Sequence, residues 1–392
     1  MSYICAIDQG TSSSRALLFD ANLNVIASHQ VAIKTYYPNP GWVEQDPQEI
    51  IDSVITAVRE TLREAKLEAK DVLAFAITNQ RETSIVWEKA TGNPVYPAIV
   101  WQSRQSSFYC EDLKSKGFEP FIKKKTGLVI DSYFSASKIR FILDEIVDGQ
   151  KRADAGELAF GTVDTWLVHH LSKGKDFVSD VTNASRTLLM NIEKCEWDPK
   201  LLDIWNIPSN MLPKIVDTAG LLAECDASWF GHAIPIASLV GDQQAALFGQ
   251  LCLEAGDVKN TYGTGCFLLM NTGEKKIESK NGLLTTIAWR RNGKINYALE
   301  GSVFIAGAAI QWLRDGLHFI ESSSVCEEKA LSVPSSEGIV VVPAFVGLGA
   351  PYWQSDAKGA IFGLTRGTTD AHIVRATLES LALQTYDVVQ AM

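Results

Sequence analysis

Residues 3–20 have the sequence YICAIDQGTSSSRALLFD, in which two apolar runs flank a turn of glycine and hydroxyl residues. This pattern predicts a β-hairpin with an unusually polar tip. The tip, residues 10–15, offers backbone N–H groups, the hydroxyls of Thr11 and Ser12–Ser14, and the guanidinium of Arg15. Such groups can bind a phosphate, although glycine and serine are also common in turns that have no binding role.

Asp8 directly precedes this turn. Mg²⁺ is typically bound by few carboxylates, with water and phosphate oxygens supplying its other ligands. Asp8 is therefore a candidate Mg²⁺ residue, and initiation of the turn is the alternative interpretation.

A second hairpin of the same kind is predicted at residues 260–270, NTYGTGCFLLM, where a Gly-Thr-Gly turn again separates apolar strands. The similarity suggests two related domains that meet near residues 249–256. The length of 392 residues also favours two or three domains, at roughly 150 residues each. We therefore expect a duplicated α/β architecture with a cleft between its halves.

Polar residues also follow two predicted strands between the hairpins. Residues 72–77 form a continuous apolar run, typical of a strand buried on both faces, and TNQRET follows at residues 78–83. Residues 234–240 predict another strand, which leads into Asp242 and the helical run 245–251. Because ligands gather at the carboxyl ends of strands in open α/β sheets, both polar segments are candidate binding regions.

Each candidate residue also has a structural interpretation. Asp242 is either a helix N-cap, worth ~1 kcal/mol, or a catalytic base that the helix dipole weakens; phosphoryl transfer tolerates a weak base. Arg81 and Glu82 are either a surface ion pair worth ~0–1 kcal/mol or ligands for a small polyhydroxylated substrate. Trp101 and Phe267 lie next to polar turns, where large aromatics are more often core than site.

Two further local patterns predict secondary structure. Asp46-Pro47-Gln48-Glu49 predicts a helix start, with Asp46 as N-cap, proline at the first position and Glu49 at the third. Residues 149–156 are polar and predict a loop.

The composition, 46% hydrophobic and 21% charged residues, is typical of a soluble globular protein. The net charge of −10 provides no general attraction to nucleic acid or anionic lipid, and no apolar run reaches the ~18 residues of a membrane span. The sequence has no signal-peptide pattern, no metal-binding spacing among its seven cysteines, and no Walker A or dinucleotide motif. We expect a cytoplasmic protein with reduced thiols, no membrane insertion and no nucleic-acid partner.

Six motifs together resemble the FGGY family of carbohydrate kinases, and within it the glycerol kinases. They are DQGTSSSR (8–15), NQRET (79–83), GTVDTWL (161–167), TNASRT (182–187), GDQQAALFGQ (241–250) and PAFVGLGAPYW (343–353). They occur in family order and at family-like spacing. The first is shared across actin-like ATPases, whereas the second and fifth are specific to glycerol kinases within the family.

The resemblance implies an α/β fold of two ribonuclease H-like domains, of the actin-like ATPase type, closing over a cleft. Residues 1–250 would form the N-terminal domain, with the glycerol site and the phosphate hairpin, and residues 251–392 a nucleotide-binding C-terminal domain. Family members continue past a helix equivalent to residues 376–392 into a segment that holds the adenosine. We therefore expect the second domain to be incomplete, in a chain compatible with a homo-oligomer.

The implied activity is ATP-dependent phosphorylation of glycerol to sn-glycerol 3-phosphate, with ATP and Mg²⁺ required. By similarity, the substrate-binding residues are Arg81, Glu82, Trp101, Tyr133, Asp242, Gln243 and Phe267. Asp242 would be the catalytic base and Asp8 the metal residue. The nucleotide-binding residues would be Thr11, Ser12, Ser13, Arg15, Thr264, Gly307 and Gln311.

Two alternatives to glycerol phosphorylation stay open at this point. Another FGGY kinase, acting on a pentulose or on gluconate, is one, although the Arg81–Glu82 pair and the aromatics of a small site argue against it. The other is a catalytically impaired, shortened form that acts as a binding protein, which the missing adenosine segment supports.

Overall fold

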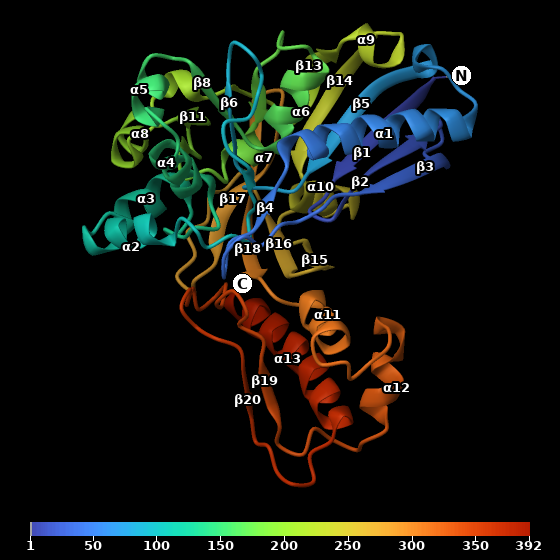
Figure 1. The fold of residues 1–392 in the computed structure, drawn as a ribbon, viewed down its shortest axis with the longest axis vertical. Helices are drawn as coiled ribbons and strands as arrows, with labels where there is room; N and C mark the ends of the chain where they lie inside the picture. Colours follow the sequence, from blue (N-terminus) through green and yellow to red (C-terminus); the bar gives the residue numbers. More distant parts are fainter. Residues whose placement is uncertain (1) are drawn as a thin grey trace. The chain divides into compact units, whose positions relative to one another are not determined.

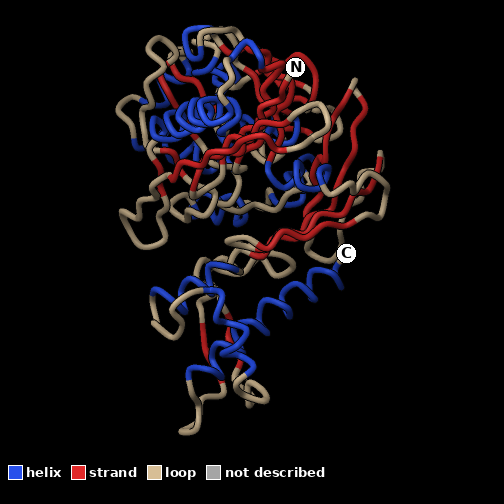
Figure 2. Tube along the Cα trace, turned by 90° about the vertical axis from the view of Figure 1, so that its right-hand side faces the viewer, coloured by secondary structure: helices blue, strands red, loops and turns tan. Residues whose placement is uncertain are grey.

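The computed structural model describes residues 2–392, which divide into two compact units (Figure 1). The first unit runs to Phe248 and also includes Gly273–Lys276 and Thr286–Tyr297. The second comprises Gly249–Thr272, Ile277–Thr285 and Ala298–Met392. Both units contain helices and strands (Figure 2), so the predicted two-part α/β fold is confirmed.

The first unit is built on a six-stranded sheet of order β13-β14-β5-β1-β2-β3. Its strands are β1 (Tyr3–Gln9), β2 (Ser13–Phe19), β3 (Val25–Ala32), β5 (Val72–Asn79), β13 (Ala219–Cys225) and β14 (Ile234–Gly241). The predicted first hairpin is the antiparallel pair β1–β2. β5 pairs in parallel with both β1 and β14, so these three strands end at the same edge of the sheet.

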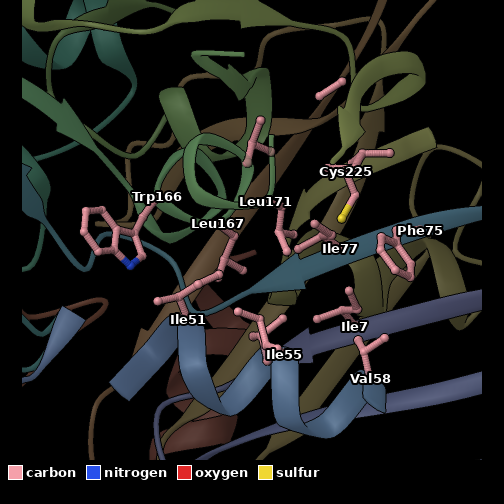
Figure 3. Packing of buried hydrophobic residues seen from close by; sticks show 14 of the residues in the cluster. Ile7, Ile51, Ile55, Val58, Phe75, Ile77, Trp166, Leu167, Leu171 and Cys225 are labelled. Carbon is pink, nitrogen blue, oxygen red and sulfur yellow. The ribbon is translucent and has the colours of Figure 1, made fainter. Parts of the chain in front are cut away.

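Helices α1 (Pro47–Ala65) and α6 (Val163–Leu171) share one hydrophobic core with this sheet. Figure 3 shows Ile55 of α1 beside Ile7 of β1, and Leu171 of α6 beside Ile77 of β5. Strand β5 was expected to be buried on both faces. This was wrong at the start of the strand, because Leu73, its second residue, is 61% exposed. The core-facing side of the sheet is covered by the helices, whereas this end of the opposite side is open.

Helix α1 begins as predicted, because Asp46 accepts a hydrogen bond from the backbone N–H of Gln48 at 2.8 Å. Glu49 does not bond back to the N-cap residue. It accepts a hydrogen bond from the backbone N–H of Lys34 at 3.1 Å and so connects α1 with the segment that follows β3. The predicted loop at 149–156 is wrong, since Gly149–Asp154 form α5. Gly149 has no room for a side chain, because a Cβ there would lie 2.2 Å from the carbonyl oxygen of Leu143.

The other strands of the first unit are β4 (Glu44–Gln45), β6 (Ile85–Glu88), β7 (Ala98–Ile99), β8 (Leu158–Gly161), β9 (Val178–Asp180), β10 (Met190–Asn191), β11 (Glu196–Trp197) and β12 (Lys214–Val216). Its other helices are α2 (Ser107–Ser115), α3 (Glu119–Thr126), α4 (Ser135–Glu145), α7 (Val181–Ala184), α8 (Pro199–Trp205), α9 (Ala227–Phe230) and α10 (Asp242–Gly249). Short 3₁₀ turns occupy Ala69–Asp71 and Ser209–Met211.

The predicted second hairpin is also confirmed, as β15 (Val258–Tyr262) paired antiparallel with β16 (Cys266–Gly273). These strands belong to a sheet of order β15-β16-β18-β17, completed by β17 (Leu284–Arg291) and β18 (Lys294–Val303). The remaining elements are α11 (Gly307–Asp315), a 3₁₀ turn (Ser323–Val325), α12 (Cys326–Leu331), β19 (Val340–Val342), β20 (Ala360–Phe362) and α13 (Asp370–Ala391).

Two expectations about the whole chain can be compared with the structure. All seven cysteines have free, buried thiols. Within residues 2–392, no helix combines the length and the apolar character needed to cross a membrane.

The two faces of β5 provide a test of where the stability of the first unit resides. Ile77→Ala removes a fully buried side chain from the core, and we expect it to lower the free energy of unfolding by about 2–5 kcal/mol. Leu73→Ala, on the exposed face of the same strand, should change it by less than about 0.5 kcal/mol. Urea unfolding followed by tryptophan fluorescence measures both, and equal effects would contradict this assignment of the faces.

Candidate active site

Three parallel strands end together in the first unit and create the candidate site. In the sheet register, Asn79 at the end of β5 lies opposite both Gln9 of β1 and Gly241 of β14. The backbone N–H of Gln80 then donates to the carbonyl of Gln9 at 2.7 Å. The segments that follow the three strands are therefore held side by side, as the carboxyl ends of parallel strands require.

Arg81 lies at the centre of this edge and contacts several of the predicted residues. Its Nε is 3.5 Å from Oδ1 of Asp242, its Nη2 donates to the hydroxyl of Tyr133 at 3.3 Å, and its Nη1 donates to Gln244 at 3.2 Å. The side chain is only 2% exposed, so the interpretation of an ordinary surface ion pair is wrong. A buried guanidinium needs such partners to replace its lost hydration.

Glu82 is also buried, and it is held by a residue to which the sequence analysis gave no role. Nε of Arg186 lies 2.5 Å from Oε1 of Glu82, and both side chains are almost fully buried. The backbone of Glu82 is left-handed, with φ 61°, and its carbonyl accepts hydrogen bonds from the hydroxyls of Ser84 and Ser135. Arg186 lies in the TNASRT motif, and the only sequence signal for it was an arginine among small polar residues.

Trp101 connects the turn at residues 10–15 with another residue predicted to bind the substrate. Its indole N–H donates to the hydroxyl of Thr11 at 2.9 Å, and its ring packs edge-on against Tyr133 with centroids 5.8 Å apart. Trp101 is thus largely buried, as its core interpretation predicted, and it also contacts two of the predicted site residues.

The turn itself is held by Gln30 of β3, which the sequence analysis missed. Gln30 donates to the hydroxyl of Ser13 at 2.7 Å and accepts from Nη2 of Arg15 at 2.5 Å, while Ser12 is exposed. The expectation that all three serine hydroxyls form the cradle is wrong for Ser14. Its hydroxyl points into the protein and bonds with Ser53 of α1 at 2.8 Å.

Asp242 and Gln243 begin helix α10 directly after β14. Oδ1 of Asp242 accepts from the backbone N–H of Gln243 at 2.8 Å, and Oδ2 accepts from the side-chain amide of Gln243 at 3.1 Å. Asp242 is the first residue of the helix and its carboxylate accepts from the next N–H, so the N-cap interpretation is wrong. The side chain remains 36% exposed, and its role as a catalytic base stays a prediction.

The carboxyl group of Asp8 is affected by the charge of Asp242. Loss of hydration and then the negative charge of Asp242 raise the pKa of Asp8, against the opposing charge of Arg15. Carboxylates are the donor type that Mg²⁺ uses, one or two of them together with phosphate oxygens, so the chemistry of Asp8 and Asp242 is compatible with the predicted metal role of Asp8.

The second unit has a pocket of its own, of about 350 Å³, between the β15–β16 turn and helix α11. The three predicted residues Thr264, Gly307 and Gln311 all line it. Gly307 permits close backbone approach, because its N–H donates to the carbonyl of Gly263 at 2.9 Å and a Cβ would lie 2.6 Å from that oxygen. The pocket is also lined by residues that the sequence analysis did not name: Tyr262, Gly263, Ile310, Arg314 and Ser323.

Phe267 lies on β16 of the same unit and is buried. Its carbonyl oxygen accepts a hydrogen bond from the ammonium of Lys259 at 3.4 Å.

Solved structures with this fold define the class of the protein. The structure of Plasmodium falciparum glycerol kinase with ADP has a TM-score of 0.87 at 38% identity, covering 100% of this chain and 78% of that one. The xylulose kinase of Lactobacillus acidophilus shares the fold, with a TM-score of 0.85 at 21% identity and the same coverage. The class is therefore that of the two-domain α/β kinases.

Sequence comparison gives the family. Residues 3–249 match the N-terminal domain of the FGGY family of carbohydrate kinases, and residues 258–392 match its C-terminal domain. Glycerol kinase of Oceanobacillus iheyensis is 56% identical over 391 residues, which cover 100% of this chain and 78% of the relative. Glycerol kinase of Bacillus subtilis is 55% identical, with 79% of its length covered. The chain belongs to the FGGY family of carbohydrate kinases, as its six motifs predicted.

Lys138 makes the stability of this region dependent on pH. It is fully buried in α4 and donates to the carbonyl oxygens of Tyr133 and Phe134, at 2.6 and 3.0 Å. Burial lowers its pKa to about 7, although the charge of Glu82 opposes the shift. Since a lysine in an unfolded chain titrates near pH 10.4, unfolding takes up a proton between about pH 7 and that value. Stability should therefore rise with pH across this window, by up to about 1.4 kcal/mol per pH unit.

Lys138→Met should remove this component of the rise, whereas Lys151→Met, on the exposed surface of α5, should leave it unchanged. The free energy of unfolding in urea at pH 7, 8 and 9 measures the slope for each protein. A slope in Lys138→Met equal to that of the wild type would show that the amine is not the titrating group.

Proposed function

We propose that this chain transfers the γ-phosphoryl group of ATP to a terminal hydroxyl of glycerol, giving sn-glycerol 3-phosphate and ADP. The observation that carries the proposal is the cluster of the buried residues Arg81, Glu82 and Tyr133 with the partly exposed Asp242, which presents charged and hydroxyl groups at one strand edge. The curated relatives at 55–56% identity, over the whole chain, are glycerol kinases.

Within this function, the glycerol hydroxyls are bound by Arg81, Glu82, Tyr133 and Asp242, with Gln243 assisting. Trp101 and Phe267 contact its carbon atoms. The phosphate contacts are assigned to Thr11, Ser12, Ser13 and Arg15, and the nucleotide contacts to Thr264, Gly307 and Gln311. In domain terms, residues 1–250 bind glycerol and phosphate, and residues 251–392 bind the nucleotide.

Asp242 is the proposed base. The bond between the γ-phosphorus and the bridging oxygen of ADP breaks, the bond from phosphorus to the glycerol oxygen forms, and the hydroxyl proton passes to the carboxylate of Asp242. The loose transition state of phosphoryl transfer requires positioning more than early proton removal, and Gln243 and Arg81 fix the carboxylate. Asp8, with Asp242 nearby, is assigned to Mg²⁺, which neutralises phosphate charge when bound.

A panel of ATP acceptors tests the substrate. We expect strong preference for glycerol over xylulose and gluconate, and the reverse preference would overturn the proposal. The xylulose and gluconate kinases of Lactobacillus acidophilus, which have this fold, are 21–22% identical to the chain, a likeness that concerns the fold alone.

Asp242→Asn should abolish most turnover and preserve glycerol binding. The amide keeps the size of the side chain and one oxygen that can accept from the backbone N–H of Gln243, whereas its NH₂ group cannot accept from the side-chain amide of Gln243. Because the amide also cannot take up the proton, we expect kcat to fall about 10²–10⁴-fold. Coupled ADP release measures turnover, and calorimetry measures glycerol affinity, which should change by less than about threefold. Asp203→Asn, on the exposed surface of α8, is the matched control; a kcat in Asp242→Asn close to that of the control would make the base assignment wrong.

Gly307→Ala should separate nucleotide binding from glycerol binding. The added methyl group would lie 2.6 Å from the carbonyl oxygen of Gly263 and displace the pocket wall, so ATP affinity should fall about tenfold while glycerol affinity is maintained. Gly367→Ala is the control, since its Cβ meets nothing closer than Thr365 at 3.8 Å. Calorimetric titration with ATP and with glycerol distinguishes the variants, and equal ATP affinities would exclude Gly307 from the pocket's function.

A further inference from the structure

One buried segment of the first unit contacts Glu82 and the backbone next to Arg81 and Asp242. The proposed function gives this segment no role. It runs from Asp180, at the end of β9, through the short helix α7 to Arg186. Every side chain that it contributes to the contacts below is at most 1% exposed.

The first contact fixes the backbone that carries Asp242. The hydroxyl of Thr182 accepts a hydrogen bond from the N–H of Gly241 at 2.8 Å, and donates to Oδ1 of Asp180, also at 2.8 Å. Gly241 is enclosed, because a Cβ there would lie 2.8 Å from the side chain of Arg81. The Thr182 hydroxyl thus fixes the backbone at the end of strand β14, directly before Asp242.

The second contact fixes the backbone that carries Arg81. Asn183 and Asn79 exchange two side-chain hydrogen bonds, at 2.9 and 3.1 Å. Asn79 is the last residue of β5, two positions before Arg81. A reciprocal amide pair holds both partners in one orientation, because each must present its oxygen to the other's NH₂ group.

The third contact fixes a substrate-binding side chain directly. Arg186 donates to Glu82 at 2.5 Å, and its guanidinium lies over the rings of Tyr133 and Phe134, at 5.4 and 5.1 Å from their centroids. One guanidinium therefore locates both the carboxylate and the phenol that we assign to glycerol.

Asp180 anchors the segment to the rest of the unit. Its carboxylate accepts hydrogen bonds from the backbone N–H groups of Thr182 and Asn183, at 3.0 and 2.9 Å, and from the hydroxyl of Thr218 at 3.0 Å. These hydrogen bonds fix the orientation of the Asp180 side chain relative to the start of α7 and to Thr218.

We propose that Thr182, Asn183 and Arg186 are positioning residues for glycerol phosphorylation, each fixing one of Asp242, Arg81 and Glu82. The inference rests on the proposed function, and it extends that function to residues that do not touch the substrate. Its physical basis is that small displacements of reacting groups, of about 1 Å, cost on the order of 10²-fold in rate.

Thr182 offers the sharpest test, because valine and serine separate its shape from its hydroxyl. Thr182→Val should lower kcat about 10–100-fold and change the glycerol KM by less than about threefold, since Asp242 acts on the chemical step. Thr182→Ser retains the hydroxyl and should recover kcat to within about threefold of wild type. Thr187→Val is the matched control: Thr187 is also buried, but among residues 2–392 its hydroxyl bonds only to the backbone of its chain neighbours Ala184 and Leu189.

Amide hydrogen exchange of the peptide containing Gly241 provides a second readout that does not need turnover. The exchange of Gly241 should accelerate at least tenfold in Thr182→Val, and should stay near the wild-type rate in Thr182→Ser and Thr187→Val. If the wild-type chain binds glycerol and ATP without turnover, the proposed function fails, and the exchange rates alone decide whether the hydroxyl holds Gly241.

Two results would overturn the inference. One is wild-type kcat and unchanged Gly241 exchange in Thr182→Val. The other is equal loss of kcat in Thr182→Val, Thr182→Ser and Thr187→Val, because this would reflect general damage to the segment and not the loss of one hydrogen bond.

Discussion

The burial of two opposite charges at one strand edge is the constraint on which the site depends. Arg81 and Glu82 are adjacent in sequence and each is about 2% exposed. Removing such groups from water costs several kcal/mol per ion, which only fixed partners of good geometry can offset. Arg81 is matched by Asp242 and Tyr133, and Glu82 by Arg186. The elements that supply these partners must therefore hold their positions before any substrate binds, which is the condition for electrostatic preorganisation.

The register of the sheet fixes the relative positions of these residues. β5 lies between β1 and β14 and is parallel to both, so the ends that carry Asp8, Arg81 and Asp242 are fixed by backbone hydrogen bonds. A slip of one residue would turn every side chain of a strand to the other face, and would move Ile77 out of the core. The hydrophobic core and the site geometry are thus specified together, although the residues that make them are different.

The sequence predicted those features whose causes are local. The first hairpin and the start of α1 at Asp46 each depend on a few consecutive residues, and both were predicted correctly. Helix α5 at Gly149–Asp154, where a loop was predicted, is a local error, whereas the errors at the site concern partners distant in the chain. Ser14 bonds to Ser53, 39 positions away, and Arg186 bonds to Glu82, 104 positions away. Strand alternation places Ser14 on the same face as Ala16 and Leu18, opposite Arg15, but the identity of its partner Ser53 follows only from the packing of α1 on the hairpin.

In the proposed function, the two parts of the chain recognise their ligands by different means, and this has a consequence for specificity. The first unit presents buried charged side chains, which are left unpaired if a substrate lacks a matching hydroxyl; such mismatches can cost 10⁴–10⁵-fold. The pocket of the second unit depends on backbone approach at Gly307 and Gly263, which responds to shape. Substitutions near Arg81 and Tyr133 should therefore change the acceptor while the nucleotide pocket is retained. Xylulose and gluconate kinases share this fold at 21–22% identity, as expected where one fold supports several acceptor sites.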